Sequence, residues 1–201
     1  MKRFATCLGA LTCLALSGCM TDAGPSQPSV TRFHLGQPIA RAVIAVEASD
    51  PAEASSLEFD AIADAVGREL TRLGWTVQKG NARSEQVAIV SVTQSDRIAP
   101  RRSGLSVGIG GGTGSYGRHG AVGVGGGVEI PVGRRTDLLV ATRLSVRIQR
   151  RSDATVAWEG RAEFEARAGT PEAARAAAAS RLAAALFRDF PGESGRTIRV
   201  R

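Results

Sequence analysis

Two long runs of alternating apolar and polar residues constrain the fold of this chain more than any other part of its sequence. One run extends from Leu138 to Gln149 and the other from Val156 to Glu165. Alternation with a period of two is typical of a strand that buries one face and exposes the other. Ser152 lies in the turn between the runs, so they predict a β-hairpin. We expect its exposed face to pair arginines with glutamates across the strands, drawn from Arg143, Arg147, Arg161, Glu159, Glu163 and Glu165.

A helix of about 17 residues is predicted upstream of the hairpin, because apolar residues recur there at three- and four-residue steps. Ser55 and Glu58 have the spacing of a capping box at its start. Gly74 is the expected C-terminal stop, since glycine readily takes the left-handed conformation that ends helices. The predicted buried stripe consists of Phe59, Ile62, Ala63, Val66, Leu70 and Leu73.

A second helix is predicted near the C-terminus. Thr170 is its expected N-cap, Pro171 its first residue and Glu172 part of an acidic first turn. We expect Pro191 and Gly192 to end it. Its predicted buried stripe consists of Ala178, Leu182, Ala185, Leu186 and Phe190.

Shorter apolar runs predict the remaining strands. They lie at residues 41–48, 75–78 and 87–94, and residues 197–201 are expected to add a last strand. The run at 87–94 is apolar on both faces, which favours a central place in the sheet. Two helices among mostly hairpin-linked strands predict an α+β fold, with a mostly antiparallel sheet and both helices on one of its faces.

The N-terminus has the layout of a secretory signal. Two basic residues precede an apolar run at residues 4–16, and about 13 residues at roughly 1.5 Å each cover only two-thirds of a ~30 Å hydrocarbon core. The segment is therefore expected to be a removed signal peptide. The sequence Leu16 to Cys19 resembles the lipobox of bacterial lipoproteins. That resemblance implies that Cys19 is lipidated with acyl chains such as palmitate and becomes the mature N-terminus.

These features divide the chain into parts. We expect a lipoprotein signal peptide at residues 1–18, the lipidated cysteine with a flexible tether at 19–29, and a single α+β lipoprotein domain at 30–201. Cys7 and Cys13 leave with the signal, so no disulfide can form within the mature chain. The residue after the lipidated cysteine is Met20 rather than Asp, which resembles lipoproteins sent to the outer membrane. We therefore expect a lipid anchor in the outer membrane and a domain that faces the periplasm.

The charge of the chain is modestly basic. The formal net charge is +7, and part of it leaves with the signal. Almost all of the remaining basic residues are arginines, with Lys79 the only lysine. Nucleic-acid binding is disfavoured, because aromatic residues are scarce and no basic helix or stacking motif occurs.

A glycine-rich tract occupies residues 104–133, which contain 13 glycines. Apolar residues alternate on both sides of its centre, which predicts a hairpin or loop that extends the sheet. A membrane-inserting hairpin of an oligomeric pore is the alternative, since each arm has nearly the ~9 to 11 residues that a barrel strand needs. The GxGxxG spacing at residues 112–117 is expected to arise by chance, because no helix signal follows it directly.

Four arginines flank this tract: Arg101, Arg102, Arg134 and Arg135. Closure of a hairpin would gather them at its base. Guanidinium groups bind phosphates in a bidentate manner, so these residues are candidates for contact with anionic lipid. A solvated cluster of charges is the alternative interpretation.

Catalysis has little support in the sequence. His34 is expected in a strand near the tether and His119 in the glycine-rich tract, and neither belongs to a metalloprotease or nucleophile-elbow motif. Trp75 and Trp158 are expected to be core residues. We expect no enzyme activity, no cofactor and no metal site.

Several landmarks of the chain together resemble a known family. They are the lipobox, the helix end Leu70 to Trp75, the motif Trp158 to Ala162, and the motif Phe190 to Gly192. The chain resembles the bacterial lipoproteins of the family called domain of unknown function 4136. The resemblance implies a lipid-anchored domain in the periplasm, and it brings no established activity or catalytic residues.

Two functions are compatible with these features. The favoured one is a non-enzymatic structural or interaction module of the cell envelope, with the membrane and an unidentified envelope protein as partners. The alternative is a component of an oligomeric transport or secretion assembly that uses the glycine-rich hairpin. The sequence leaves the oligomeric state open.

Overall fold

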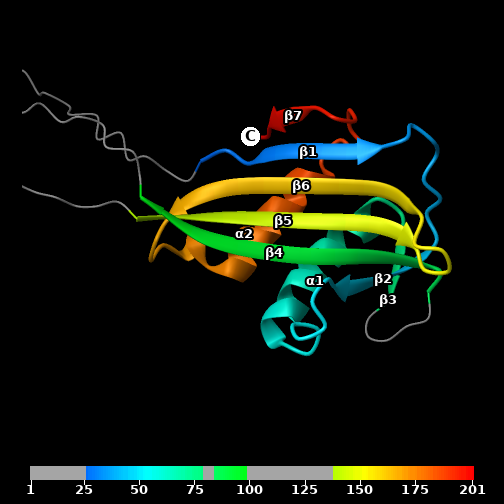
Figure 1. The fold of residues 1–201 in the computed structure, drawn as a ribbon, viewed down its shortest axis with the longest axis horizontal. Coiled ribbons are helices and arrows are strands. Elements are labelled where there is room, and N and C mark those ends of the chain that lie inside the picture. The colour runs from blue at the N-terminus through cyan, green and yellow to red at the C-terminus, as the bar shows by residue number, and fades with distance from the viewer. Residues whose placement is uncertain (1–25, 79–83, 99–137) are drawn as a thin grey trace, which may run out of the picture.

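The protein folds around one mixed β-sheet. A computed structural model describes residues 26–78, 84–98 and 138–201, whose seven strands follow the order β3-β2-β4-β5-β6-β1-β7 across the sheet (Figure 1). β2 is parallel to β3 and β4, and the other neighbours are antiparallel. The predicted α+β fold with a mostly antiparallel sheet is confirmed. The strands are β1 (Ser29–His34), β2 (Val43–Ala48), β3 (Thr76–Gln78), β4 (Gln86–Ile98), β5 (Leu138–Arg150), β6 (Val156–Arg167) and β7 (Thr197–Arg199).

The hairpin predicted from the alternating runs forms the centre of the sheet. β5 and β6 are antiparallel neighbours, and Arg143 lies directly opposite Glu163. β4 is longer than predicted, because it pairs with β5 along the whole length of both strands, from Gln86 opposite Arg150 to Ile98 opposite Leu138. The predicted central position of this strand is confirmed.

The first helix, α1 (Leu57–Arg72), forms as predicted except at its start. Ser56, not Ser55, is the N-cap, and its hydroxyl accepts a hydrogen bond from the Phe59 amide at 3.0 Å. The predicted capping box is therefore wrong. The N3 position of this N-cap is Phe59, which has no carboxylate, and the Glu58 carboxylate instead accepts a hydrogen bond from Arg175. Gly74 follows the helix with a φ of +99°, as expected for a stop.

The second helix, α2 (Arg175–Phe187), is shorter than predicted. The predicted N-cap Thr170 precedes a 3-10 turn, η1 (Pro171–Ala173), and its hydroxyl bonds the Arg167 carbonyl rather than a helix amide. The helix also ends before Pro191, because Arg188 leaves the helical conformation with a ψ of 138°.

Arg175 joins the start of α2 to the start of α1. Its guanidinium binds Glu53 at 2.6 Å, Glu58 at 2.9 Å and the Val92 carbonyl at 2.8 Å. Burial alone would lower the pKa of Arg175, but the hydrogen bonds that it donates to Glu53 and Glu58, together with the charges of these carboxylates, raise the pKa above its ordinary value. This junction fixes α2 against β4 and α1.

Both helices pack on one face of the sheet, as predicted, and the opposite face is open (Figure 1). α1 lies over the β2 and β3 side, whereas α2 lies behind β5 and β6. A single apolar core fills the space between the two layers. Its largest fully buried side chains are Trp158, Phe187, Ile44, Ile62, Leu70, Leu144, Ile148, Leu182 and Leu186.

Several sequence predictions fall outside the described residues. They concern the signal peptide, Cys19, the glycine-rich tract at 104–133 with His119, and the four arginines Arg101, Arg102, Arg134 and Arg135. Within the part of the chain that the structure describes, neither helix has the length and apolar character needed to cross a bilayer.

Candidate functional site

Four aromatic rings gather between β6 and the C-terminal end of α2. Trp158 is fully buried and stacks on Phe187, with ring centroids 5.3 Å apart. Phe190 lies 5.2 Å from Trp158 and 5.4 Å from Trp75. The indole N–H of Trp158 donates to the Pro191 carbonyl at 3.1 Å. Both tryptophans are core residues, as predicted, and we call these four rings the aromatic cluster.

Two glycines, Gly160 after Trp158 and Gly192 after Phe190, leave room for neighbouring side chains. A Cβ atom at Gly160 would lie 2.4 Å from the Trp158 ring and 2.7 Å from Leu186. Gly192 has a φ of +78°, and a Cβ atom there would lie 2.6 Å from the Arg32 side chain. Both distances are shorter than real Cβ contacts, so each position requires glycine. The glycines of the two motifs therefore have a packing role.

Arg32 caps the C-terminal end of α2. The sequence did not predict this role. It extends from β1 and is only 3% exposed. Its guanidinium donates to the carbonyls of Leu186 at 2.9 Å, Ala185 at 3.2 Å and Arg188 at 2.6 Å. These carbonyls have no amide partner at a helix end, and a cation is favourable beside them. Burial lowers the pKa of Arg32, and the charge of Asp189 opposes that shift.

His34 holds the C-terminal turn, which we define as residues 188–195. One ring nitrogen, Nδ1, accepts from the Gly36 amide at 3.1 Å. The other nitrogen, Nε2, must then carry the proton, and it donates to the Gly192 carbonyl at 2.9 Å. The backbone of His34 also exchanges hydrogen bonds with the Ser194 hydroxyl. Both ring nitrogens of His34 therefore have structural partners.

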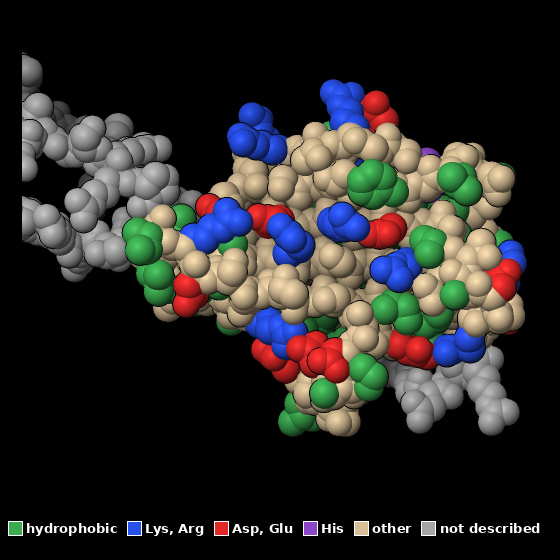
Figure 2. All heavy atoms as spheres, viewed as in Figure 1, with side chains coloured by type: hydrophobic (Ala, Val, Ile, Leu, Met, Phe, Trp, Pro, Cys, Tyr) green, Lys and Arg blue, Asp and Glu red, His purple; other side chains and the backbone are tan. Residues whose placement is uncertain are grey.

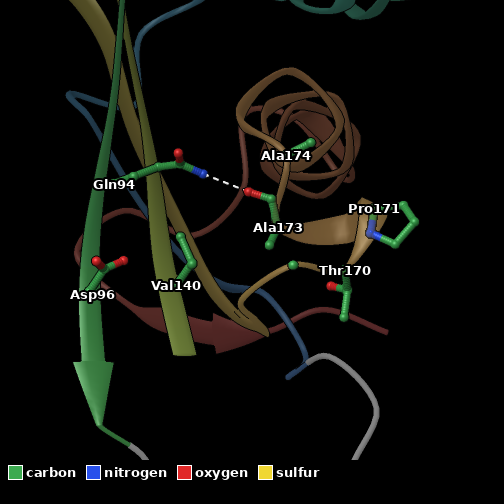
Figure 3. Close-up of a pocket in the computed structure, with 8 residues that line it drawn as sticks. Gln94, Asp96, Val140, Thr170, Pro171, Ala173 and Ala174 are labelled. Carbon is green, nitrogen blue, oxygen red and sulfur yellow. Dashed lines mark hydrogen bonds between the residues drawn. The ribbon is translucent and has the colours of Figure 1, made fainter. Parts of the chain in front are cut away.

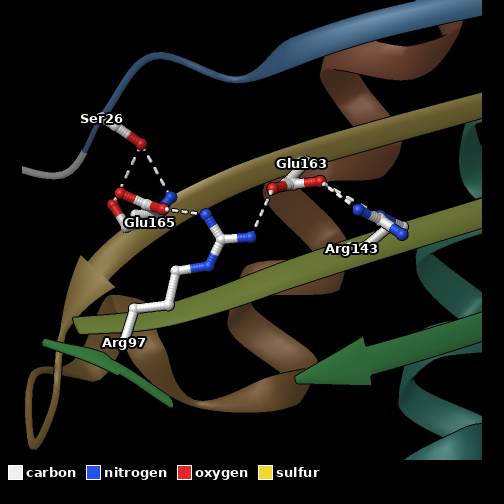
Figure 4. Close-up of polar contacts among 5 residues, drawn as sticks. All are labelled: Ser26, Arg97, Arg143, Glu163 and Glu165. Carbon is white, nitrogen blue, oxygen red and sulfur yellow. Dashed lines mark hydrogen bonds and ion pairs between the residues drawn. The ribbon is translucent and has the colours of Figure 1, made fainter. Parts of the chain in front are cut away.

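The open face of the sheet carries paired arginines and glutamates, as predicted (Figure 2). Glu163 binds Arg143 at 2.8 Å and lies 3.9 Å from Arg97, while Arg97 also binds Glu165 at 3.2 Å (Figure 4). About half of each arginine is exposed, so each pair contributes at most about 1 kcal/mol. The row continues along β5 and β6 with Glu159, Arg147 and Arg161.

One end of the sheet brings together three segments that are distant in sequence. Ile98 ends β4 opposite Leu138, which begins β5, and Arg167 ends β6 opposite the next residue of β5. Ser26 is bonded to Glu165 of β6 near the same end (Figure 4). We call this part of the sheet the tether end, because the chain toward Cys19 leaves the described domain there.

An open hollow of about 600 Å³ lies near the tether end, between β4 and η1 (Figure 3). The Gln94 amide crosses one side of it and donates to the Ala173 carbonyl and the Thr142 hydroxyl, both at 2.9 Å. Asp96 is the one ionisable residue among those that line the hollow. The sequence analysis did not predict this hollow, since its walls come from residues far apart in the chain.

Metal ligation has no candidate among the described residues. No group of three His, Cys, Asp or Glu side chains gathers within residues 26–78, 84–98 and 138–201. The sequence-predicted lipid sites, Cys19 and the four tract arginines, lie outside those residues. The structure nevertheless places Ile98 and Leu138, which precede and follow the segment that contains the tract and its four arginines, directly opposite each other.

Comparison with known proteins gives a family without an assigned activity. The profile of the family described as domain of unknown function (DUF4136) matches residues 31–192. A similar curated protein is an uncharacterized protein of Zymomonas mobilis, which is 29% identical over 88% of this chain and 81% of its own length.

Two solved structures show weaker likeness. The PelC dodecamer from Paraburkholderia phytofirmans matches with a TM-score of 0.40 and 10% identity, over 78% of this chain and 92% of that one. A PDZ domain protein from Parabacteroides distasonis matches with a TM-score of 0.45 and 13% identity, over 87% of this chain and 39% of that one.

Proposed function

This chain belongs to the DUF4136 family of domains of unknown function, and on that premise we propose that it is a lipid-anchored protein of the bacterial cell envelope. In this proposal the domain is a non-enzymatic structural or interaction module. It sits in the outer membrane through its lipid and faces the periplasm. It requires no cofactor or metal.

The role of the family motifs carries this proposal. Trp158 and Phe190 lie in the aromatic cluster, while Gly160 and Gly192 make room for neighbouring side chains. Arg32 and His34, which contact Gly192, are bonded to backbone carbonyls. Motif residues of an enzyme commonly converge on a substrate cavity, whereas these stabilise a turn and a helix end.

The lipid anchor is supported by the lipobox sequence that ends at Cys19. Two or more acyl chains give stable membrane attachment. The test is labelling of cells with radioactive palmitate, followed by separation of membrane and soluble fractions. Wild-type protein should carry label in the membrane fraction, and the Cys19→Ala variant should carry none. Equal labelling of the two proteins would contradict the anchor.

The four arginines that flank the glycine-rich tract are proposed to contact anionic lipid. Arg101 lies three residues after Ile98 along the chain, and Arg135 lies three residues before Leu138. Replacement of all four by glutamine should weaken binding of the protein to vesicles that contain phosphatidylglycerol. Binding to vesicles without anionic lipid is the control, and it should be unchanged.

The alternative assembly function is distinguished by molecular mass. In mild detergent a monomer or dimer supports the module, whereas a large ring supports a transport or secretion assembly. Crosslinking in cells, with mass spectrometry of the products, would then identify the envelope protein that the module binds. A ring composed only of this chain would contradict the favoured function.

A further inference from the structure

The tether leaves the domain from a fixed point. The Ser26 amide donates to the Glu165 carbonyl at 2.9 Å, and the Glu165 amide donates to the Ser26 hydroxyl at 2.7 Å. Glu165 is itself bound to Arg97 of β4 (Figure 4). These bonds hold the first described residue against β6, near the tether end of the sheet.

The chain between Ser26 and the lipidation site is short. Cys19 precedes Ser26 by seven residues, and a fully extended chain of that length spans at most about 25 Å. β5 has 13 residues, so the sheet is about 40 Å long in this direction. A lipid on Cys19 therefore keeps the tether end of the domain close to the bilayer. The chain between Cys19 and Ser26 is too short to place that lipid at the opposite end of the strands.

The tether end exposes two large apolar side chains. Ile98 is 72% exposed and Leu138 is 40% exposed, and they are direct partners across β4 and β5. Hydrophobic side chains appear at this end of the molecule in Figure 2. Cross-strand neighbours project from the same face of a sheet, so the two side chains form one small apolar patch.

We propose that the tether end rests on the lipid surface that holds the Cys19 anchor, with Ile98 and Leu138 in the interfacial region. This inference rests on the proposed lipid anchor.

Two other orientations are possible for a tethered domain. The opposite end of the sheet also exposes apolar residues, namely Leu35, Val43 and Val156. The short tether disfavours contact through that end. The domain could instead lie flat on its open face, but the three glutamates of that face are already paired with its arginines, so few of those charges are available to lipid.

The test compares three positions in the full, lipidated protein. Ile98→Cys reports the tether end, Val156→Cys the opposite end, and Thr93→Cys the open face. Each is labelled with an environment-sensitive fluorophore and reconstituted in vesicles of phosphatidylethanolamine with some phosphatidylglycerol. Headgroup-attached nitroxide lipids then quench labels that lie at the interface. All three residues are exposed in the structure, so the substitutions are compatible with folding.

The expected result is quenching at position 98 several-fold stronger than at 93 and 156. Strongest quenching at 156 or at 93, or none at any position, would overturn the docking proposal and leave the anchor intact. The anchor has its own readout. Acylated Cys19 has no free thiol, so the protein without an introduced cysteine should take up no label. Uptake of label there, with an unmodified mass, would instead contradict the proposed function.

Discussion

The two ends of this domain differ in how their side chains are used. Around the C-terminal turn, Trp158, Arg32 and His34 are bonded inward to backbone carbonyls. At the tether end, Ile98 is 72% exposed and Leu138 is 40% exposed. Trp158 to Ala162 and Phe190 to Gly192 lie in or beside the first region. These two segments therefore hold the fold, and we expect contact with the surroundings elsewhere.

The largest effect should follow from loss of the Trp158 ring. Trp158→Ala removes a fully buried indole that contacts Phe187 and Phe190, and such truncations cost about 3 to 5 kcal/mol. Chemical denaturation should show this as a lower midpoint. A loss below about 1 kcal/mol would mean that the ring contributes little to the core, and the distinction between the two ends would fail.

A smaller loss is expected for Arg32→Met. The replacement fills much of the same space but leaves the carbonyls of Leu186 and Ala185 without their donors. Unpaired buried groups make this cost roughly 2 to 3 kcal/mol. Arg199→Met is the matched control, because Arg199 is an exposed arginine on β7. Equal denaturation midpoints for both variants would show that Arg32 does not stabilise the end of α2.

Two glycine substitutions test whether the packing around Trp158 requires glycine at position 160. Gly160→Ala places a methyl group 2.4 Å from the Trp158 ring, and such overpacking costs about 1 to 3 kcal/mol. Gly67→Ala is the control. Its new methyl group would lie 3.4 Å from Val77, and alanine favours helix by up to about 1 kcal/mol. Thermal melts should separate the two, and a stabilised Gly160→Ala would contradict the packing role.

The smallest effect is expected on the open face. A double-mutant cycle of Arg143→Met and Glu163→Gln should give a coupling of about 0.2 to 1 kcal/mol, because both partners are partly exposed. The coupling should fall as salt is added. A coupling above about 2 kcal/mol would show that the open face contributes to stability as strongly as single contacts around the C-terminal turn.

Local patterns explain what the sequence predicted correctly. The β5–β6 hairpin has two long alternating runs joined by a short turn, so its pairing follows from nearby residues. The helix starts one residue later than predicted, so Ser56 rather than Ser55 is the N-cap. The preceding turn fixes this start, because the Ser56 amide donates a hydrogen bond to the Glu53 carbonyl there.

Long-range contacts explain what the sequence missed. The carbonyls that Arg32 binds lie more than 150 residues away in the chain. Its one local signal was a charge at an inward position of a short strand, between Val30 and His34. The hollow beside Gln94 and the tether end likewise form only where segments distant in sequence come into contact. The alternation of apolar and polar residues does not predict these tertiary contacts.

Residues around the C-terminal turn stabilise the fold, and we propose that the tether end contacts the membrane. Hydrogen exchange of the full lipidated protein, in detergent and in vesicles, tests it most directly. Peptides around Trp158 and Phe187 should exchange slowly and equally in both conditions, because they report the stable core. Peptides that contain Ile98 and Leu138 should exchange more slowly in vesicles than in detergent. Unchanged exchange at Ile98 and Leu138, or slowing by vesicles around Trp158 instead, would contradict the claim.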